Sequence, residues 1–253
     1  MNLRGAWTLF GRETRRFFKV RMQTIVAPAL TALLYLIVFR YAMGSRTVPG
    51  LSVAYFDFLV PGLAMMAMMQ NAFANTSSSL IAGKVMHVHA HLLMAPLSAA
   101  EVVAAFLLAA LMRALVVASV FLLVLVPFVD LPLPHPALAL FFTVCAALTM
   151  GGMGLIGGMW AKKFDDMATV NNFVIMPLTF LSGVFYSIGQ LPEMWQRVNG
   201  FNPFFYLVDG FRYALLGVGE CDPRLAAGFV LMVTLLVVAA DWWLWRAGWR
   251  MKE

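Results

Sequence analysis

Three alternate histidines lie in 77–101, the one sizeable break in the apolar first half of the chain that should face the cytoplasm: His87, His89 and His91. His87 and His91 would share one face of a helix, as two ligands of a metal ion can. A tetrahedral site takes four ligands, and no Cys or carboxylate completes the set before Glu101. The pattern therefore favours an exposed, pH-sensitive segment, and no metal site is predicted.

Asp165 and Asp166 are two further side chains that could take part in catalysis. Two carboxylates in a short turn could act as acid and base, but an Asp at this place more often caps the next helix. The chain has no G-x-x-x-x-G-K-[ST], H-E-x-x-H or G-x-S-x-G motif. It therefore has no means of hydrolysing ATP by itself, and we do not expect it to be an enzyme.

Three polar residues interrupt otherwise apolar stretches: Asn71, Arg113 and Asn172. A charge within an apolar segment is costly unless it faces the interior of a bundle, a partner or a water-filled cavity. Arg113 is therefore a functional candidate, although no acidic partner for it is evident from the sequence.

The composition is that of a membrane protein. Of 253 residues, 62% are hydrophobic and 12% charged, and the mean hydropathy is +0.84. A soluble domain of this size could not bury so much apolar surface. The basic residues behind the net charge of +6 lie at the ends of apolar segments, so anionic lipid headgroups are their expected partners and nucleic acid is not.

Apolar segments of spanning length predict six transmembrane helices, at about 22–43, 55–75, 100–126, 137–160, 167–188 and 224–245. Lys and Arg number about twelve in the segments on the side of the N-terminus and about four on the other side, which places both termini in the cytoplasm. In the fourth span, Gly154 and Gly158 have the spacing that lets two helices approach closely.

Two further segments, one before the first span and one between the fifth and sixth, are also expected to be helical. Residues 1–21 combine aromatic and basic residues at helical spacing, which predicts an amphipathic helix at the cytoplasmic interface and is less typical of a solvated basic tail. Residues 190–216 alternate short apolar pieces with Pro and Gly, which predicts short re-entrant helices between the fifth and sixth spans. The expected fold is an all-α polytopic bundle, with a transmembrane domain at 22–253.

Residues 161–217 include FDD, PLTFLSGVFY, NP and GFRY in that order, and FLVPGLAMM (58–66) and LLMAPLS (92–98) precede them. Together these motifs resemble the ATP-binding-cassette (ABC) type-2 export permeases, closest to the YadH-like and nodulation-factor-exporter branch. The resemblance covers nearly the whole chain.

The resemblance implies a multi-pass permease of the bacterial cytoplasmic (inner) membrane. Two copies pair among the membrane lipids, and a dimer of a separate cytoplasmic ABC ATPase binds beneath them. ATP and Mg belong to that ATPase, and no cofactor to this chain. The cargo would be amphipathic, such as a lipid, a glycolipid or polysaccharide, or a drug. From the residues themselves, an integral-membrane enzyme acting on lipid and a structural membrane subunit stay open as alternatives.

The resemblance also assigns roles to residues. A coupling loop at 77–100, with a helix at 84–96, would contact the ATPase through Lys84, His87, His91, Leu92, Leu93 and Pro96, although the family commonly has an acidic residue where His91 stands. The substrate path would be lined by Tyr35, Met65, Met66, Met69, Asn71, Arg113, Asn172, Met176 and Phe180. The outer gate would contain Phe185, Tyr186, Pro203 and Arg212.

Overall fold

The structure, a computed structural model, describes residues 2–20, 22–43, 47–49, 51, 53–87, 89–125, 128–129 and 132–250. In these ranges the regular elements are helices, and one isolated bridge joins Thr47 and Ala54. In chain order they are α1 (Leu3–Lys19), the π-helical η1 (Met22–Val26), α2 (Ala27–Met43), α3 (Tyr55–Val85), α4 (His89–Met94), α5 (Ala99–Leu125), α6 (Pro136–Trp160), α7 (Phe164–Val170), the π-helical η2 (Asn171–Ile175), α8 (Met176–Phe180), the short 3-10 helix η3 (Ile188–Gln190), α9 (Glu193–Asn199), α10 (Pro203–Leu216) and α11 (Pro223–Ala247). The predicted helical class is confirmed.

Within the described residues, three helices are long and apolar enough to cross a membrane: Ala99–Val124, Pro136–Trp160 and Pro223–Ala247. The apolar part of α2, Ala27–Tyr41, is shorter. The predicted membrane class is thus confirmed, whereas the count of six spans, their orientation and the re-entrant depth of 190–216 stay predictions.

α3 is the longest helix among the described residues, with 31 residues. It continues beyond residue 75, the predicted end of the second span, to Val85. Its polar residues do not end it, because their hydroxyl groups donate to backbone carbonyls within the helix, as Ser77 does to Phe73 O at 2.7 Å. The first part of the predicted coupling loop is therefore helical.

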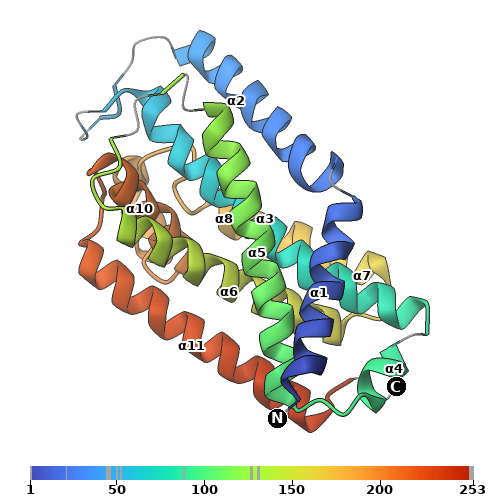
Figure 1. The fold of residues 1–253 in the computed structure, drawn as a ribbon. Coiled ribbons are helices and arrows are strands. Elements are labelled where there is room, and N and C mark those ends of the chain that lie inside the picture. Colours follow the sequence, from blue (N-terminus) through green and yellow to red (C-terminus); the bar gives the residue numbers. More distant parts are fainter. Residues whose placement is uncertain are drawn as a thin grey trace.

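α3 and α6 run through the middle of the bundle and pack on each other more extensively than any other pair of helices (Figure 1). Glycines make this approach possible. A Cβ at Gly154 would lie 2.4 Å from Phe73 O and 2.4 Å from Thr76 Oγ1, and one at Gly158 would lie 2.9 Å from Leu80 Cβ. The spacing of these two glycines correctly predicts a close helix–helix contact.

Both π-helical segments end two residues before a proline, η1 before Pro28 and η2 before Pro177. Proline has no N–H to donate within a helix, and a wider turn relieves the clash of its ring with the preceding carbonyl. In η2 the Met176 N–H donates to Asn171 O, five residues earlier. The helix that begins at Phe164 ends at Phe180, before the predicted residue 188, and a turn with Gly183 at φ 73° follows.

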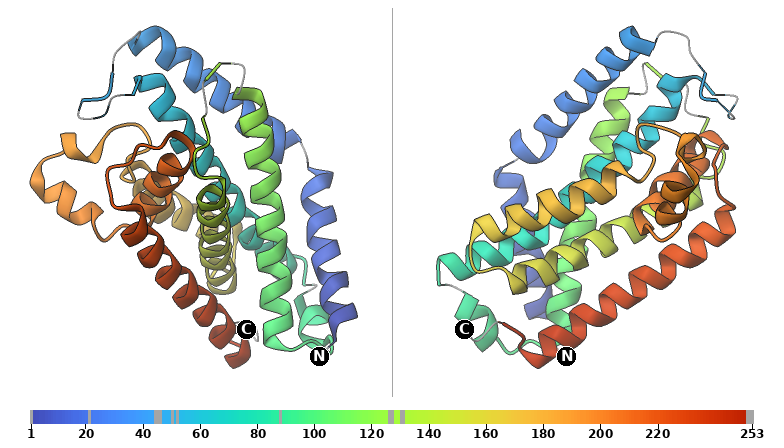
Figure 2. Two further views of the ribbon diagram at one scale, coloured as in Figure 1. Left: turned by 60° about the vertical axis from the view of Figure 1, so that its left-hand side comes forward. Right: turned by 180° about the vertical axis from the view of Figure 1, so that it is seen from behind.

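The ends of the described chain lie near α4 at one end of the bundle, and α10 lies at the other (Figures 1 and 2). The predicted pair of short helices in 190–216 is present as α9 and α10. α10 packs against α3, α6 and α11, which fixes the turn after α8 to the core of the bundle.

Candidate functional site

The predicted coupling segment, 84–96, is divided into two helical pieces. α3 ends at Val85, His87 has a left-handed φ of 55°, and α4 covers His89–Met94. Left-handed backbone cannot continue a right-handed helix, because the Cβ then crowds the following carbonyl. The single helix expected here is therefore interrupted at His87, and the side chain of His91 lies outside the described residues.

Lys84 points back into the bundle. Its Nζ donates to Met159 O and, at 3.1 Å, to Ala161 O at the end of α6. The last carbonyls of a helix have no partners within the helix and carry partial negative charge, which a lysine ammonium satisfies. Lys84 thus joins the end of α3 to the end of α6.

The outer surface of this segment is apolar. Leu93 is 42% exposed and Met94 is 72% exposed, and Val85 and Met86 are also exposed. Leu92 is half-buried and lines a cavity of about 730 Å³ between α1, α3, α4 and α5. Exposed leucine and methionine side chains beside one another are typical of a surface that another protein covers.

Glu101 and Ser98 form a capping box at the start of α5. The Glu101 carboxylate accepts from Ser98 N at 2.8 Å and Ser98 Oγ at 2.9 Å, and Ser98 Oγ accepts from Glu101 N at 3.3 Å. The same carboxylate accepts from the backbone N–H of Asn2. The start of α1 is thereby attached to the start of α5, a contact that our sequence reasoning missed although the S-x-x-E spacing signals the cap.

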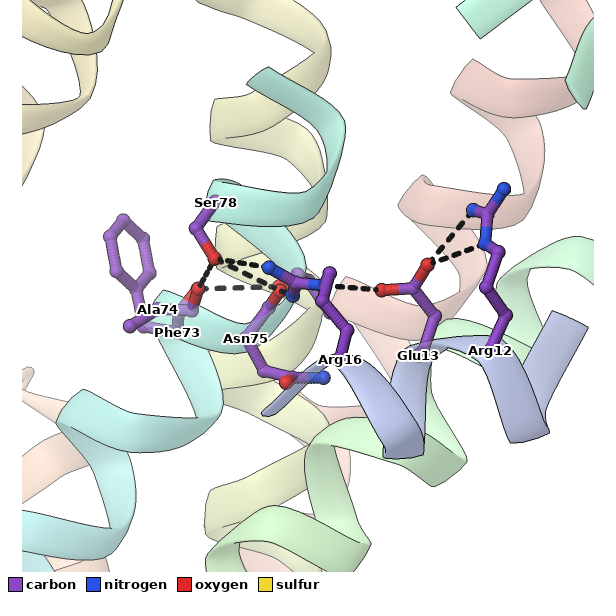
Figure 3. Close-up of polar contacts among 8 residues, drawn as sticks. Arg12, Glu13, Arg16, Phe73, Ala74, Asn75 and Ser78 are labelled. Carbon is purple, nitrogen blue, oxygen red and sulfur yellow. Dashed lines mark hydrogen bonds and ion pairs between the residues drawn. The ribbon is translucent and has the colours of Figure 1, made fainter. Parts of the chain in front are cut away.

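A charged cluster attaches α1 to α3 (Figure 3). The buried Glu13 carboxylate accepts from Arg12 Nη2 at 2.8 Å and from Arg16 Nε at 3.2 Å. Arg16 also donates to Ser78 Oγ at 3.1 Å and to the backbone carbonyl of Asn75. Arg16, a basic residue of α1 expected to face lipid headgroups, is therefore directed towards α3 and only partly exposed.

A second cavity, of about 260 Å³, lies between α2, α3 and α5. Three of the predicted path residues line it: Tyr35, Met66 and Asn71. Its other walls include Leu63, Gln70 and Phe121. The structure thus brings together a polar amide, a tyrosine and apolar side chains on the helices expected to border the path.

Arg113 is 8% exposed and lies behind this cavity. It donates to Asn71 Oδ1 from Nε at 3.1 Å and from Nη2 at 2.8 Å, and Asn71 Nδ2 donates to Ala67 O at 3.0 Å. Both residues were predicted separately, whereas their pairing was not. A neutral amide satisfies hydrogen bonds but leaves the positive charge of Arg113 uncompensated.

The remaining predicted path residues do not line this cavity. Met65 and Met69 are fully buried in the core of α3. Asn172, Met176 and Phe180 are exposed on η2 and α8. These last three share an outward-facing surface of the chain.

An aromatic cluster adjoins the 260 Å³ cavity at Tyr35. The ring of Phe185 lies 6.0 Å from Tyr35, 6.0 Å from Phe39 and 5.5 Å from Phe180, measured between centroids. The Tyr55 hydroxyl donates to the Phe185 carbonyl. Phe185, a predicted gate residue, is thus in contact with two predicted path residues, and Phe39 and Tyr55 are additions that the sequence did not single out.

Arg212 is buried and fixes the turn after α8. Its Nη2 donates to Gly183 O at 2.7 Å and its Nε to Phe58 O at 3.3 Å, while its guanidinium lies 3.6 Å from the centroid of the Phe58 ring. Asp209 Oδ1 lies 3.6 Å from Arg212 Nη1. Arg212 therefore holds α10, α3 and the Gly183 turn together rather than lining an opening.

The other two predicted gate residues have structural contacts as well. Pro203 begins α10, where Asn202 Oδ1 caps the helix by accepting from Phe204 N at 3.0 Å. The Tyr186 hydroxyl donates to Phe180 O at 3.2 Å.

Glu220 extends the charged network of α10 into the loop before α11. Asp209 accepts from the Glu220 and Cys221 backbone N–H groups at 3.0 and 2.9 Å, and the Glu220 carboxylate accepts from Ile188 N and Gly189 N, both at 3.2 Å. Burial, followed by the nearby negative charge of Asp209, raises the pKa of Glu220 above its usual value.

Asp166 acts as a helix cap. Its carboxylate accepts from Lys162 N at 2.8 Å and Lys163 N at 3.0 Å, and these two hydrogen bonds hold its pKa below the usual value. Asp165 is exposed and its backbone carbonyl accepts from Thr169. The geometry supports the capping interpretation of this pair. No group of three potential metal ligands is present among the described residues.

Comparison with known proteins gives consistent matches. Residues 4–216 match the family model described as "ABC-2 type transporter". The "Inner membrane transport permease YadH" of Escherichia coli (strain K12) is 35% identical over 230 residues, which cover 91% of this chain and 89% of that protein, and the protein of the same name from Shigella flexneri matches equally. "Nodulation protein J" of Rhizobium leguminosarum bv. viciae is 29% identical over 90 residues, 36% of this chain and 34% of that protein.

Proposed function

This chain belongs to the ABC-2 type transporter family, and on that premise we propose that it is the permease subunit of an ATP-driven exporter, working as a homodimer with a separate cytoplasmic ATPase. The name of the Escherichia coli relative supports a place in a bacterial inner membrane. The two alternatives, an enzyme acting on lipid and a structural subunit, gain no support from the geometry of Asp165 and Asp166.

The observation that carries the proposal is the apolar surface of Val85, Met86, Leu93 and Met94 at the end of the bundle that holds both chain ends. It is short, partly helical and free of acidic residues, as expected of a segment that inserts into a groove of another protein. Leu92 turns inward, so displacement of α4 by the partner would reach α1 and α5 directly.

The homodimer is supported by the outward-facing surface of α2 and η2–α8. Leu30, Leu34, Ile37 and Val38 are exposed on α2, and Phe173 and Phe180 on η2–α8. These helices flank the aromatic cluster around Phe185, so two copies paired along this surface would place their clusters on either side of one path. The substrate is expected to be amphipathic, because the residues lining the α2–α3–α5 cavity are mostly apolar.

Substitution of Leu93 tests the coupling contact. We expect Leu93→Asp to abolish co-purification of a nucleotide-hydrolysing partner from native membranes in mild detergent, because it places a charge in an apolar contact. The measurement is ATP hydrolysis per mole of the purified chain, with the partner identified by ATP photolabelling.

Leu133→Asp is the matched control, since Leu133 is also 42% exposed but lies in the connection between α5 and α6 at the opposite end of the bundle. It should leave the ATPase activity unchanged. A purified wild-type chain without ATPase activity, or equal activity in the Leu93→Asp variant, would refute the proposal.

A further inference from the structure

A face of α3 bears polar groups that two arginines from other helices reach. Asn71, Asn75 and Ser78 follow one another at spacings of four and three residues, which places them on one face of the helix. Arg113 of α5 binds the Asn71 side chain. Arg16 of α1 binds Ser78 and the Asn75 carbonyl, as Figure 3 shows.

Positive charge is in excess at this place. Arg113 and Arg16 bind neighbouring parts of this face, Arg113 at Asn71 and Arg16 at Ser78 and the Asn75 carbonyl. Glu13 is shared between Arg16 and Arg12, and among the described residues Arg113 has no acidic partner. Arg113 is buried, so little water screens its charge, and an anion bound beside it and Arg16 would compensate the excess.

Asn75 adds an unsatisfied polar side chain to the same place. It is 0% exposed, and neither its Oδ1 nor its Nδ2 has a hydrogen-bond partner in the part of the chain that the structure describes. Buried amides are nearly always hydrogen-bonded in folded proteins. In Figure 3 dashed lines reach the Asn75 backbone carbonyl but not its side-chain amide.

Asn75 and Arg113 lie between the two cavities along their helices, and Arg16 lines the larger cavity. Along α3, Asn75 falls between Asn71, which lines the 260 Å³ cavity, and Ser79, which lines the 730 Å³ cavity. Along α5, Arg113 falls between Phe106 and Phe121, which line the larger and the smaller cavity respectively.

We infer that Arg16, Asn75 and Arg113 form a binding site for the phosphate group of an anionic amphiphile, the class of substrate that this permease exports. The inference rests on the proposed function and gives it a substrate class. The two guanidinium groups supply paired N–H donors for phosphate oxygens, and Asn75 Nδ2 supplies another. The apolar chain of the ligand would lie along Leu63, Met66 and Phe121 in the smaller cavity.

Thermal unfolding of the purified full-length chain in a neutral maltoside detergent tests the site. The probes are dodecyl phosphate, dodecyl phosphocholine and inorganic phosphate. Dodecyl phosphate at about a hundred times its dissociation constant should raise the midpoint by roughly 5–10 °C in a chain of this size. The zwitterionic detergent and inorganic phosphate should give little shift at the same concentration.

Variants assign the response to the site. Arg113→Gln should weaken dodecyl phosphate at least about tenfold, as loss of a charge-assisted hydrogen bond does, whereas Arg113→Lys should keep most of the shift. Asn75→Leu, which matches the shape of asparagine, should raise the midpoint without ligand and lower the response to dodecyl phosphate. Arg4→Gln, an exposed charge on α1 that lines neither cavity, is the control and should respond like the wild type.

An unchanged dodecyl phosphate response in both Arg113→Gln and Asn75→Leu would overturn the site. If Arg113→Gln does not fold, Asn75→Leu decides alone. Equal shifts with inorganic phosphate and dodecyl phosphate would overturn the assignment of an amphiphile. If the wild type shows no dodecyl phosphate shift but a normal Leu93-dependent ATPase activity, only the site is refuted. If it shows the shift but no Leu93-dependent ATPase activity, only the permease assignment is refuted.

Discussion

A single methyl group at Gly154 tests the close packing of α3 on α6. In Gly154→Ala the new Cβ would lie 2.4 Å from Phe73 O and 2.4 Å from Thr76 Oγ1. Thr76 Oγ1 is itself fixed, since it donates to Gly151 O at 2.6 Å. The carbonyl belongs to the α3 backbone and cannot rotate away, so the two helices must separate to accept the methyl group.

The expected loss of stability follows from two opposing effects. Forcing an extra carbon into a packed interface costs about 3 kcal/mol when backbone has to move. Replacing a glycine within a helix returns up to about 1 kcal/mol through helix propensity. The net loss of about 2 kcal/mol should lower the unfolding midpoint by roughly 4–8 °C.

The same substitution at Gly228 provides the control. Gly228 is an exposed position of α11 at which a Cβ would meet nothing within 4 Å. Gly228→Ala should raise the free energy of unfolding by about 0.4–1 kcal/mol and the midpoint by roughly 1–4 °C. Tryptophan fluorescence during heating in detergent measures both. If Gly154→Ala is as stable as the wild type, the helices are not in the contact described here.

The charged network of α10 gives two further predictions. Arg212→Met leaves the Asp209 carboxylate buried without a counter-charge and should lower the free energy of unfolding by roughly 3–5 kcal/mol. Adding Asp209→Asn in a double variant should restore part of this loss. If the two variants lower the thermal midpoint additively, Arg212 and Asp209 are not coupled. Because the pKa of Glu220 is raised, the folded state binds its proton more tightly than the unfolded state does, so stability falls as the pH rises from the usual glutamate pKa through the raised value. Glu220→Gln should therefore flatten the midpoint–pH curve above the usual glutamate pKa of about 4.3. A curve that keeps its wild-type slope would refute the argument.

Local chemistry in the sequence predicted local structure well. Proline fixes its own backbone and removes a donor, and π-helical turns end two residues before Pro28 and Pro177, whereas Pro61 lies within the regular helix α3. The spacing of Gly154 and Gly158 likewise predicts which face of α6 accepts another helix. These signals depend on residues within one or two turns of each other.

Contacts between distant segments could not be predicted in the same way. Asn71 and Arg113 were singled out because each is polar within an apolar segment, but their pairing depends on how α3 is rotated against α5. Arg16 was assigned to a lipid-facing surface because basic residues dominate one side of α1, and nothing in that pattern shows that Glu13 and Ser78 draw it inward. Lys84 faces the end of α6 for a similar reason, since the carbonyls that bind it are backbone atoms and leave no trace in the sequence.

These unforeseen contacts decide how movement at the coupling segment would spread through the bundle. Lys84 joins the end of α3 to the end of α6, and Arg16 joins α3 to α1, so these three helices would move together when the ATPase displaces the last turn of α3. The backbone between α3 and α4 is not regular helix at His87, so α4 can tilt without turning α3. A push on Leu93 would therefore act first on the cavity between α1, α3 and α5, where Leu92 lies, and only then on α3 through its contacts with that cavity. The proposed phosphate site lies on this route, because Arg16 belongs to α1 and contacts the face of α3 that bears Asn75 and Ser78.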